Sequence, residues 1–412
     1  MQSQPWIVMV IILTSLLHIV LSVESDLSNG DKVLSLPGQP EVSFQQYAGY
    51  VLVNSRMRAR RALFYYFVEA ETEPASKPLV LWFNGGPGCS SVGLGAFFSH
   101  GPFKPSGSGT LIKNEYSWNK GHYVPQLAQL IIQSKINLTL KGMAMGNPLF
   151  EFGNDFNGQD EYYWSRGLIS DNSYKLLSTV CNTSTLLSQA FRGNLSEVCA
   201  SVNTEVSKEL TLSIDTNNVQ EDVCVPTTQL HLQNLNPEIS SRFQLQPSLD
   251  QQKVAANIDA CLPLKIVAYL NRTDVQTALH AKLVGVTEWT PCSKFLNYNL
   301  LELEKSTTQL LGSLVKSGIS AMVYSGDADA IIPFTGTRTL IDGLAKELGL
   351  NVTVPYRAWF EGKQVAGWTQ VYGDILTFAS VRGGGHSTPV TQPERSLALF
   401  KAFLEGKPLA ES

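Results

Sequence analysis

The 412-residue chain contains three groups of residues that could together transfer an acyl group from an amide or ester. Asn84, Gly85 and Gly86 follow an apolar run and can present backbone N–H groups to an oxyanion. Asp329 and His386 follow later, in the order that strand-based hydrolases use for the last two members of a Ser-Asp-His triad. The nucleophile is the exception, because the chain contains no Gly-x-Ser-x-Gly or Gly-x-Ser-x-Ala pentapeptide.

Each group also has a purely structural interpretation. Asp329 could close an Asx turn after Gly326, and His386, preceded by three glycines, could be a surface residue. The glycine-rich run at Asn84 could be a turn, although turns rarely need so much glycine directly after a buried strand. A catalytic interpretation is favoured because each group follows a predicted strand, and catalytic residues gather at the carboxyl ends of such strands.

The elements that must position these residues alternate between strands and helices. Apolar and β-rich runs predict strands over Tyr50–Val53, Leu63–Val68, Pro78–Phe83, Leu140–Met145, Ile319–Tyr324 and Val371–Val381, and helices over His122–Gln133 and Arg395–Glu405. Residues 165–260 are helix-like and carry cysteines, which predicts a helical insertion or cap. The alternation predicts an α/β fold with a mostly parallel central sheet.

The composition excludes several classes of protein. The chain is 43% apolar and 16% charged with a net charge of −4, which favours a large buried sheet and disfavours nucleic acid as a partner. None of the cysteines has metal-ligand spacing, so we expect no metal site. We expect no cofactor either.

The beginning of the chain predicts entry into the secretory pathway. Ile7–Leu21 is apolar apart from Thr14, Ser15 and His18, and its fifteen residues are the length of a signal-peptide core. We therefore expect residues 1–22 to be a signal peptide; an uncleaved anchor is the alternative. Five Asn-x-Ser/Thr sequons predict glycosylation, at Asn137, Asn182, Asn194, Asn271 and Asn351. Six cysteines predict disulfides without choosing among the 15 possible pairings: Cys89, Cys181, Cys199, Cys224, Cys261 and Cys292.

Several long motifs together resemble the serine carboxypeptidase family, specifically its plant serine carboxypeptidase-like members. The motifs are Leu81-Trp82-Phe83-Asn84-Gly85-Gly86-Pro87-Gly88-Cys89-Ser90-Ser91, Gly121-His122-Tyr123-Val124-Pro125-Gln126-Leu127-Ala128, Tyr324-Ser325-Gly326-Asp327-Ala328-Asp329, Trp368-Thr369-Gln370-Val371-Tyr372-Gly373 and Gly385-His386. The resemblance implies an α/β-hydrolase domain over residues 23–412, with the helical insertion within it. It also implies release of carboxyl-terminal residues from peptides or proteins, with no membrane association after signal cleavage.

The same resemblance implies roles for individual residues. Asp329 and His386 would belong to the triad, Asn84 and the Gly85 amide would bind the terminal carboxylate of the substrate, and the Gly86 amide would donate to the oxyanion. The implied disulfides are Cys89–Cys292, Cys181–Cys199 and Cys224–Cys261. The implied location is the vacuole or the extracellular space.

The chain departs from the family at the nucleophile. The family motif reads Gly-Glu-Ser-Tyr-Ala-Gly-His-Tyr, whereas this chain has Tyr116-Ser117-Trp118-Asn119-Lys120 before Gly121, so that in register Trp118 stands in place of the serine. Ser117, one residue early, would face the other way in an extended segment. Roughly sixty residues, enough for two strands and a helix of the hydrolase core, are expected to be missing here. We therefore expect poor folding or a rearranged core, because buried backbone groups would lose their partners.

Three hypotheses for function follow. The first is a secreted serine carboxypeptidase relative with little or no activity in this form. The second is descent from an acyltransferase that uses the same triad but passes the acyl group to an alcohol. The third is a non-catalytic protein that binds peptide ends through Asn84 and Gly85.

Overall fold

A computed structural model describes residues 30–53, 61–86, 88–118, 140–210, 214–224, 259–283, 285–293, 295–296 and 298–412. The described chain forms two compact units. The first comprises Met1–Leu79, Pro105–Lys113 and Val267–Trp289, and the second comprises Val80–Lys104, Asn114–Ile266 and Thr290–Ser412. The predicted signal peptide and the predicted helix over His122–Gln133 lie outside the described residues.

The first unit is built on a small antiparallel sheet. Its three strands β1 (Lys32–Val33), β2 (Gln46–Val53) and β3 (Arg61–Val68) pair in that order. The strands β2 and β3 contain the two β-rich runs that the sequence predicts here. Helix α9 (Thr273–Ala278) belongs to the same unit.

The second unit is built on a five-stranded sheet in the order β6-β7-β10-β9-β8. The strands are β6 (Gly142–Gly146), β7 (Ser320–Gly326), β8 (Val352–Glu361), β9 (Gln364–Tyr372) and β10 (Leu376–Val381). Parallel pairing joins β6, β7 and β10, whereas β9 and β8 are antiparallel additions at one side. Within the described residues, β6 is the other edge of this sheet.

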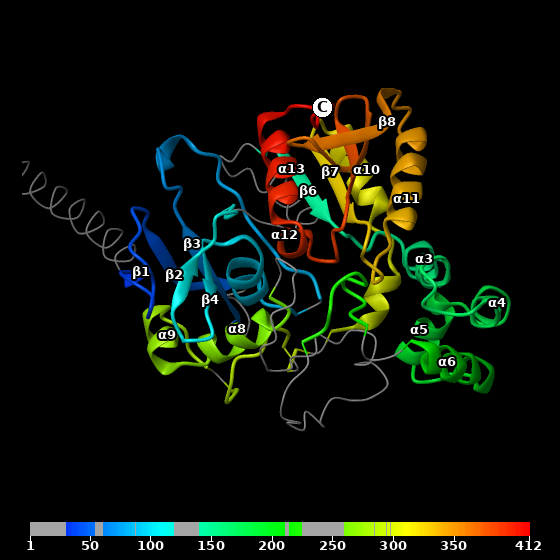
Figure 1. The fold of residues 1–412 in the computed structure, drawn as a ribbon, viewed down its shortest axis with the longest axis horizontal. Coiled ribbons are helices and arrows are strands. Elements are labelled where there is room, and N and C mark those ends of the chain that lie inside the picture. The colour runs from blue at the N-terminus through cyan, green and yellow to red at the C-terminus, as the bar shows by residue number, and fades with distance from the viewer. Residues whose placement is uncertain are drawn as a thin grey trace, which may run out of the picture. The chain divides into compact units, whose positions relative to one another are not determined.

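Helices lie on both sides of this sheet (Figure 1), and alternation along its strands buries both of its faces. Met143 and Val323 lie in a cluster with residues of α10 (Thr308–Lys316) and α11 (Phe334–Glu347). Met322, one position away from Val323, lies in the opposite cluster with Leu399 of α13 (Pro393–Glu405). Helices therefore cover both faces, as parallel strands require.

Two sequence predictions about strands are wrong. Pro78–Phe83 forms no strand, and the side chains of Leu79 and Leu81 are 64% and 49% exposed. An apolar run makes a buried strand only where neighbouring strands accept its hydrogen bonds, and no described strand pairs with this one. The predicted final strand Val371–Val381 is instead the end of β9 and all of β10, separated by a turn in which Asp374 has a φ of 54°.

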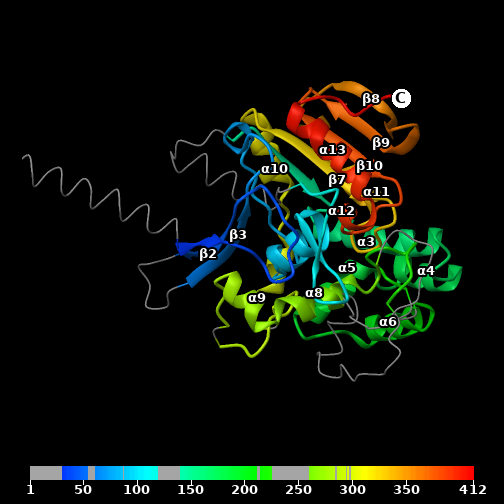
Figure 2. The same ribbon diagram turned by 60° about the vertical axis from the view of Figure 1, so that its left-hand side comes forward.

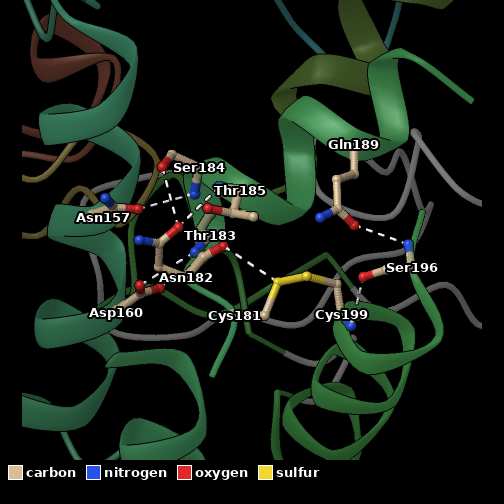
Figure 3. Close-up of a disulfide and its surroundings, with 10 residues drawn as sticks. All are labelled: Asn157, Asp160, Cys181, Asn182, Thr183, Ser184, Thr185, Gln189, Ser196 and Cys199. Atoms are coloured by element: carbon tan, nitrogen blue, oxygen red, sulfur yellow. Dashed lines mark hydrogen bonds between the residues drawn. A yellow bond between two sulfur atoms is a disulfide. The ribbon is translucent and has the colours of Figure 1, made fainter. Parts of the chain in front are cut away.

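The predicted insertion contains three helices within its described part, whereas its residues 214–224 form turns and bends (Figure 2). Its helices are α4 (Asp171–Thr179), α5 (Thr183–Phe191) and α6 (Glu197–Glu209), and they pack with α3 (Phe152–Ser165). The disulfide Cys181–Cys199 joins the beginnings of α5 and α6 (Figure 3). Ser196 caps α6 by accepting from the Cys199 amide, and Asn182 caps α5. This disulfide therefore connects two capped helix starts.

The remaining elements are short or link the larger ones. They are η1 (Pro74–Ser76), η2 (Ser91–His100), β4 (Phe103–Pro105), β5 (Leu111–Lys113), α8 (Leu262–Leu270), η3 (Leu300–Glu304) and α12 (Thr388–Thr391). Of these, η2 is a π-helix that begins directly after the glycine-rich run. No helix in the described part of the chain is long and apolar enough to cross a membrane.

Candidate active site

Asp329 and His386 come together at the end of the five-stranded sheet where its parallel strands have their carboxyl ends. Asp329 follows β7 and His386 follows β10, and these two strands are parallel neighbours. The carboxyl ends of parallel neighbours meet at the same edge, so the two loops converge. His386 Nδ1 lies 2.8 Å from Asp329 Oδ2. The Asp329 side chain is fully buried, whereas that of His386 is 34% exposed.

Asp329 has two further partners. The Asn147 side chain donates to Asp329 Oδ2 from 2.6 Å, and the Ile331 amide donates to Oδ1 from 2.7 Å. The second bond makes an Asx turn from Asp329 to Ile331, one step beyond the Gly326–Asp329 stretch in which the sequence offered such a turn, and it exists together with the contact to His386. Asn147 follows β6 and has a φ of 48°, a backbone conformation that asparagine tolerates better than most residues.

Asn147 is a residue of the site that sequence reasoning missed. A signal was present, because the predicted strand Leu140–Met145 ends at Gly146-Asn147-Pro148. A polar residue at the end of a parallel strand lies at the same edge as Asp329 and His386. The ends of β6, β7 and β10 thus each contribute one side chain to a single hydrogen-bonded group.

The surroundings set the protonation of His386. Burial lowers its pKa, but the charge of Asp329, the hydrogen bond to Asp329 and the charge of Asp215 together raise it above its usual value. When Nδ1 carries the proton that bonds to Asp329, Nε2 is left with a lone pair. That is the tautomer in which a histidine accepts a proton from a nucleophile.

The glycines before His386 allow a close approach between two loops. A Cβ on Gly326 would lie 2.1 Å from the Gly384 carbonyl oxygen, so a side chain does not fit there. Gly383 has a φ of 70°, and its amide donates to Asp327 Oδ1 from 2.6 Å. Glycine is therefore needed here for both space and conformation.

The glycine-rich run is hydrogen-bonded at its first residue, whereas its next two residues are exposed. The Asn84 amide donates to Ser91 Oγ from 3.0 Å, and its Oδ1 accepts from Trp82 Nε1 at 2.7 Å. Gly85 and Gly86 are exposed, and neither amide donates a hydrogen bond within the described residues. Such amides remain available to an anion or an oxyanion.

The end of the run is tied to a distant segment. Cys89 forms a disulfide with Cys292, and the flanking backbone makes two hydrogen bonds, from Ser90 to Pro291 at 2.7 Å and from Ser293 to Gly88 at 2.9 Å. The following helix η2 packs against α12, which begins just after His386. The loop is thus held by a cross-link and not by a sheet.

The other two disulfides are Cys181–Cys199 and Cys224–Cys261. All three match the pairs that the family resemblance implies. Among the described residues, no group of three or more His, Cys, Asp or Glu side chains could hold a metal ion.

Trp118 is a core residue of the second unit. Its side chain is 5% exposed and its ring stacks on Phe400 with centroids 4.5 Å apart and planes 7° apart. Trp82 meets it edge-on with ring centroids 5.9 Å apart, and the Trp118 amide donates to the His100 carbonyl oxygen from 2.7 Å. These contacts give Trp118 a packing role.

The arrangement defines the class of the protein. A solved prohormone-processing carboxypeptidase from Saccharomyces cerevisiae, Kex1, shares its fold, with a TM-score of 0.66, 16% identity and coverage of 92% of this chain and 96% of that chain. The chain therefore has the predicted α/β-hydrolase fold. The model of the family described as serine carboxypeptidase matches residues 37–120 and 121–406. The chain belongs to the serine carboxypeptidase family, a family of hydrolases.

Curated relatives agree with the family match. Serine carboxypeptidase-like 45 of Arabidopsis thaliana is 46% identical over 460 residues, covering 96% of each chain. Serine carboxypeptidase-like 46 of the same plant is 47% identical over 451 residues, covering 93% of this chain and 94% of the relative. Both names place the relatives in the plant group that the sequence motifs resemble.

The family match also corrects one sequence prediction. It breaks between residues 120 and 121 with no residue of this chain in between, so Trp118 lies within the first matched segment. Aligning Trp118 with the nucleophile was therefore wrong. The alignment to serine carboxypeptidase-like 45 covers 460 positions, at least 48 more than the 412 residues of this chain. Positions of the relative are thus without a counterpart here.

Proposed function

We propose that this chain is a secretory-pathway serine carboxypeptidase relative that keeps the binding and acid–base parts of the site but has lost the nucleophile. The observation that carries the proposal is the assembled pair of Asp329 and His386, bonded at 2.8 Å, in a chain without the nucleophile pentapeptide. The break in the family match at residues 120 and 121 supports the loss of the segment that carries the serine.

The remaining groups have defined tasks in this proposal. Asn84 and the Gly85 amide bind the terminal carboxylate of a peptide, and the Gly86 amide faces the carbonyl of its last peptide bond. His386 is oriented to accept a proton at Nε2, but no hydroxyl supplies one. Hydrolysis then falls to the low level that binding and oxyanion contacts alone sustain.

Peptide binding and peptide cleavage test this function separately. Purified chain is titrated calorimetrically with amino-blocked peptides, and release of the last residue is followed over hours. We expect binding of the free carboxylate form, loss of binding for its amide, and almost no release. Activated acyl esters with an alcohol acceptor test the acyltransferase alternative in the same preparation.

A matched pair of variants tests whether peptide binding depends on the glycine-rich run. Asn84→Ala should weaken binding, whereas Asn172→Ala, on the exposed side of α4, should leave it unchanged. Equal binding by both variants, or equal binding of the peptide acid and its amide, would show that the glycine-rich run does not bind carboxylates.

Passage through the secretory pathway predicts glycans at accessible sequons. Asn194 and Asn351 are exposed. Asn271 is different, because its side-chain nitrogen already donates to the carbonyl oxygens of Val267 and Trp289, both at 2.9 Å. We propose that Asn194 and Asn351 carry glycans and that Asn271 does not; mass spectrometry of peptides from protein made in plant cells measures this. Asn182 caps α5, and Asn137 lies outside the described residues.

A further inference from the structure

A short segment of the helical insertion lies across both loops of the Asp329–His386 pair. The His386 amide donates to the Asn217 carbonyl oxygen from 2.6 Å, and the Ala330 amide donates to the Thr216 carbonyl oxygen from 3.0 Å. Three residues further along, the Val219 amide donates to the Ala328 carbonyl oxygen from 3.1 Å. One segment therefore bonds to the backbone on both sides of Asp329 and at His386 itself.

Asp215 shapes this segment. Its Oδ1 accepts from the Asn217 amide at 2.9 Å and from the Asn217 side chain at 2.8 Å, and its carbonyl oxygen accepts from the Asn218 amide at 3.0 Å. These bonds form an Asx turn, which orients the next two peptide groups. The turn holds the Asn217 carbonyl oxygen at its contact with His386.

The contact between Asn217 and His386 leaves no space for a side chain at the neighbouring residue, Gly385. A Cβ on Gly385 would lie 2.5 Å from the Asn217 carbonyl oxygen and 2.7 Å from Asn218 Cβ. The third glycine before His386 is thus explained by the segment that crosses it, and not by the strand that precedes it.

We propose that Asp215 and Asn217 are positioning residues of the Asp329–His386 pair: Asn217 fixes the backbone at His386, and Asp215 builds the turn and brings its carboxylate to the segment that contacts His386. This deepens the proposed function and rests on the pair serving as the acid–base part of the site. The bonds tie the insertion to the catalytic loops, so the insertion helps to form the site instead of only covering it.

The electrostatic part of the proposal depends on the charged groups around His386. Two carboxylates act on it, Asp329 through a direct bond and Asp215 through charge alone, and both raise its pKa against the effect of burial. No cation is among the groups that affect it in the described structure. Removing the Asp215 charge should therefore lower the pKa of His386.

Asp215→Asn separates the charge from the turn, because asparagine keeps the Oδ1 acceptor and loses the charge. The titration of His386 is followed by NMR in the complete chain, with Asp222→Asn as the matched control on an exposed side chain of the same segment. We expect a lower His386 midpoint in Asp215→Asn, an unchanged one in Asp222→Asn, and recovery in Asp215→Glu. Equal midpoints in wild type and Asp215→Asn would overturn the proposal.

Gly385→Ala tests the positioning by Asn217. The added methyl group should displace Asn217 and speed hydrogen exchange at the His386 amide, whereas Gly343→Ala, where a Cβ meets no atom within 4 Å, should leave that exchange unchanged. Unchanged exchange in Gly385→Ala would count against the bond. Failure of Asp215→Asn alone to fold, with Asp215→Glu and Asp222→Asn folded, would show a role in folding and refute tuning of His386. Neither measurement depends on hydrolysis, so the proposed function can fail in the cleavage assay while these results stand.

Discussion

The loops that carry Asp329 and His386 and the run that carries Asn84 differ in how they are held. The first two leave adjacent parallel strands, β7 and β10, whose neighbours on both sides are paired. The run before Asn84 has the apolar sequence of a buried strand but pairs with no described strand, and Leu81 is half exposed. It is held by side-chain bonds to Asn84, by the Cys89–Cys292 disulfide and by the two backbone hydrogen bonds beside that disulfide.

This difference shows that the sheet fixes a loop of the site only where the strand before that loop is hydrogen-bonded to neighbouring strands. The break in the family match lies between the glycine-rich run and β6. Among the residues that the structure describes, neither the run nor the outer edge of β6 is paired with another strand. The loss of the intervening segment that we propose would account for both observations with one cause. The opposite side of the sheet keeps its strand pairing and the hydrogen-bonded pair Asp329 and His386.

Restoring the segment that we propose is lost should abolish the difference and give the largest effect. The segment of serine carboxypeptidase-like 45 that lies between the two matched regions is inserted between Lys120 and Gly121. We expect carboxypeptidase activity to rise on the order of 10⁶-fold, the size of the loss caused by removing a triad serine. Release of carboxyl-terminal residues measures it.

The same insertion with His386→Ala is the control for that experiment. It should fold like the active insertion and show nearly none of the gain. A gain that persists without His386 would mean that the Asp329–His386 pair is not the acid–base part of the site.

Removing disulfides sharpens the comparison in terms of stability. Cys89–Cys292 closes a loop of 203 residues and holds the glycine-rich run, so its loss should cost roughly 5 kcal/mol. Cys181–Cys199 closes only 18 residues, and its loss should cost about 3 kcal/mol. Double cysteine-to-alanine variants are compared by denaturant unfolding. Equal losses, or a larger loss at Cys181–Cys199, would contradict the importance of the long cross-link.

Leucine-to-alanine substitutions compare the packing of the five-stranded sheet with that of the run before Asn84. Leu311 of α10 is fully buried, so Leu311→Ala should lower the free energy of unfolding by about 2–5 kcal/mol. Leu81 is 49% exposed, so Leu81→Ala should cost less than about 1 kcal/mol. In the chain with the restored segment the cost at Leu81 should increase. A large cost at Leu81 without the insertion would show that the run is already packed.

The smallest expected effect is the pH dependence of the Asp329–His386 pair. Because the folded pKa of His386 is raised, the pair stabilises the fold fully below the unfolded value of about 6.5, and this contribution is lost as pH rises through the folded value. The stability difference between wild type and His386→Gln should therefore be largest in acid and shrink toward alkaline pH. Solvent screening at the partly exposed ring keeps it modest. A difference that grows with pH would contradict the raised pKa.

Much of the five-stranded sheet and of the Asp329–His386 pair could be predicted from the sequence. Apolar runs located β6 and β7 to within about two residues, and the strand-then-loop pattern identified Asp329 and His386 as partners. The strand prediction failed at Pro78–Phe83, because burial depends on neighbours that a local pattern does not reveal. Asn147 and Asp215 were missed because their roles depend on long-range backbone contacts. The register at Trp118 failed because the break in the family match after residue 120 leaves no local signal in the sequence.

Labelling with a fluorophosphonate, followed by mass spectrometry of the labelled peptide, tests the central claim most directly. If the nucleophile is absent, the purified chain should show no serine modification that depends on His386, while the chain with the inserted segment should be labelled at a single serine within the insertion. Rapid modification of a serine in the chain as it stands, lost in His386→Ala, would contradict the account.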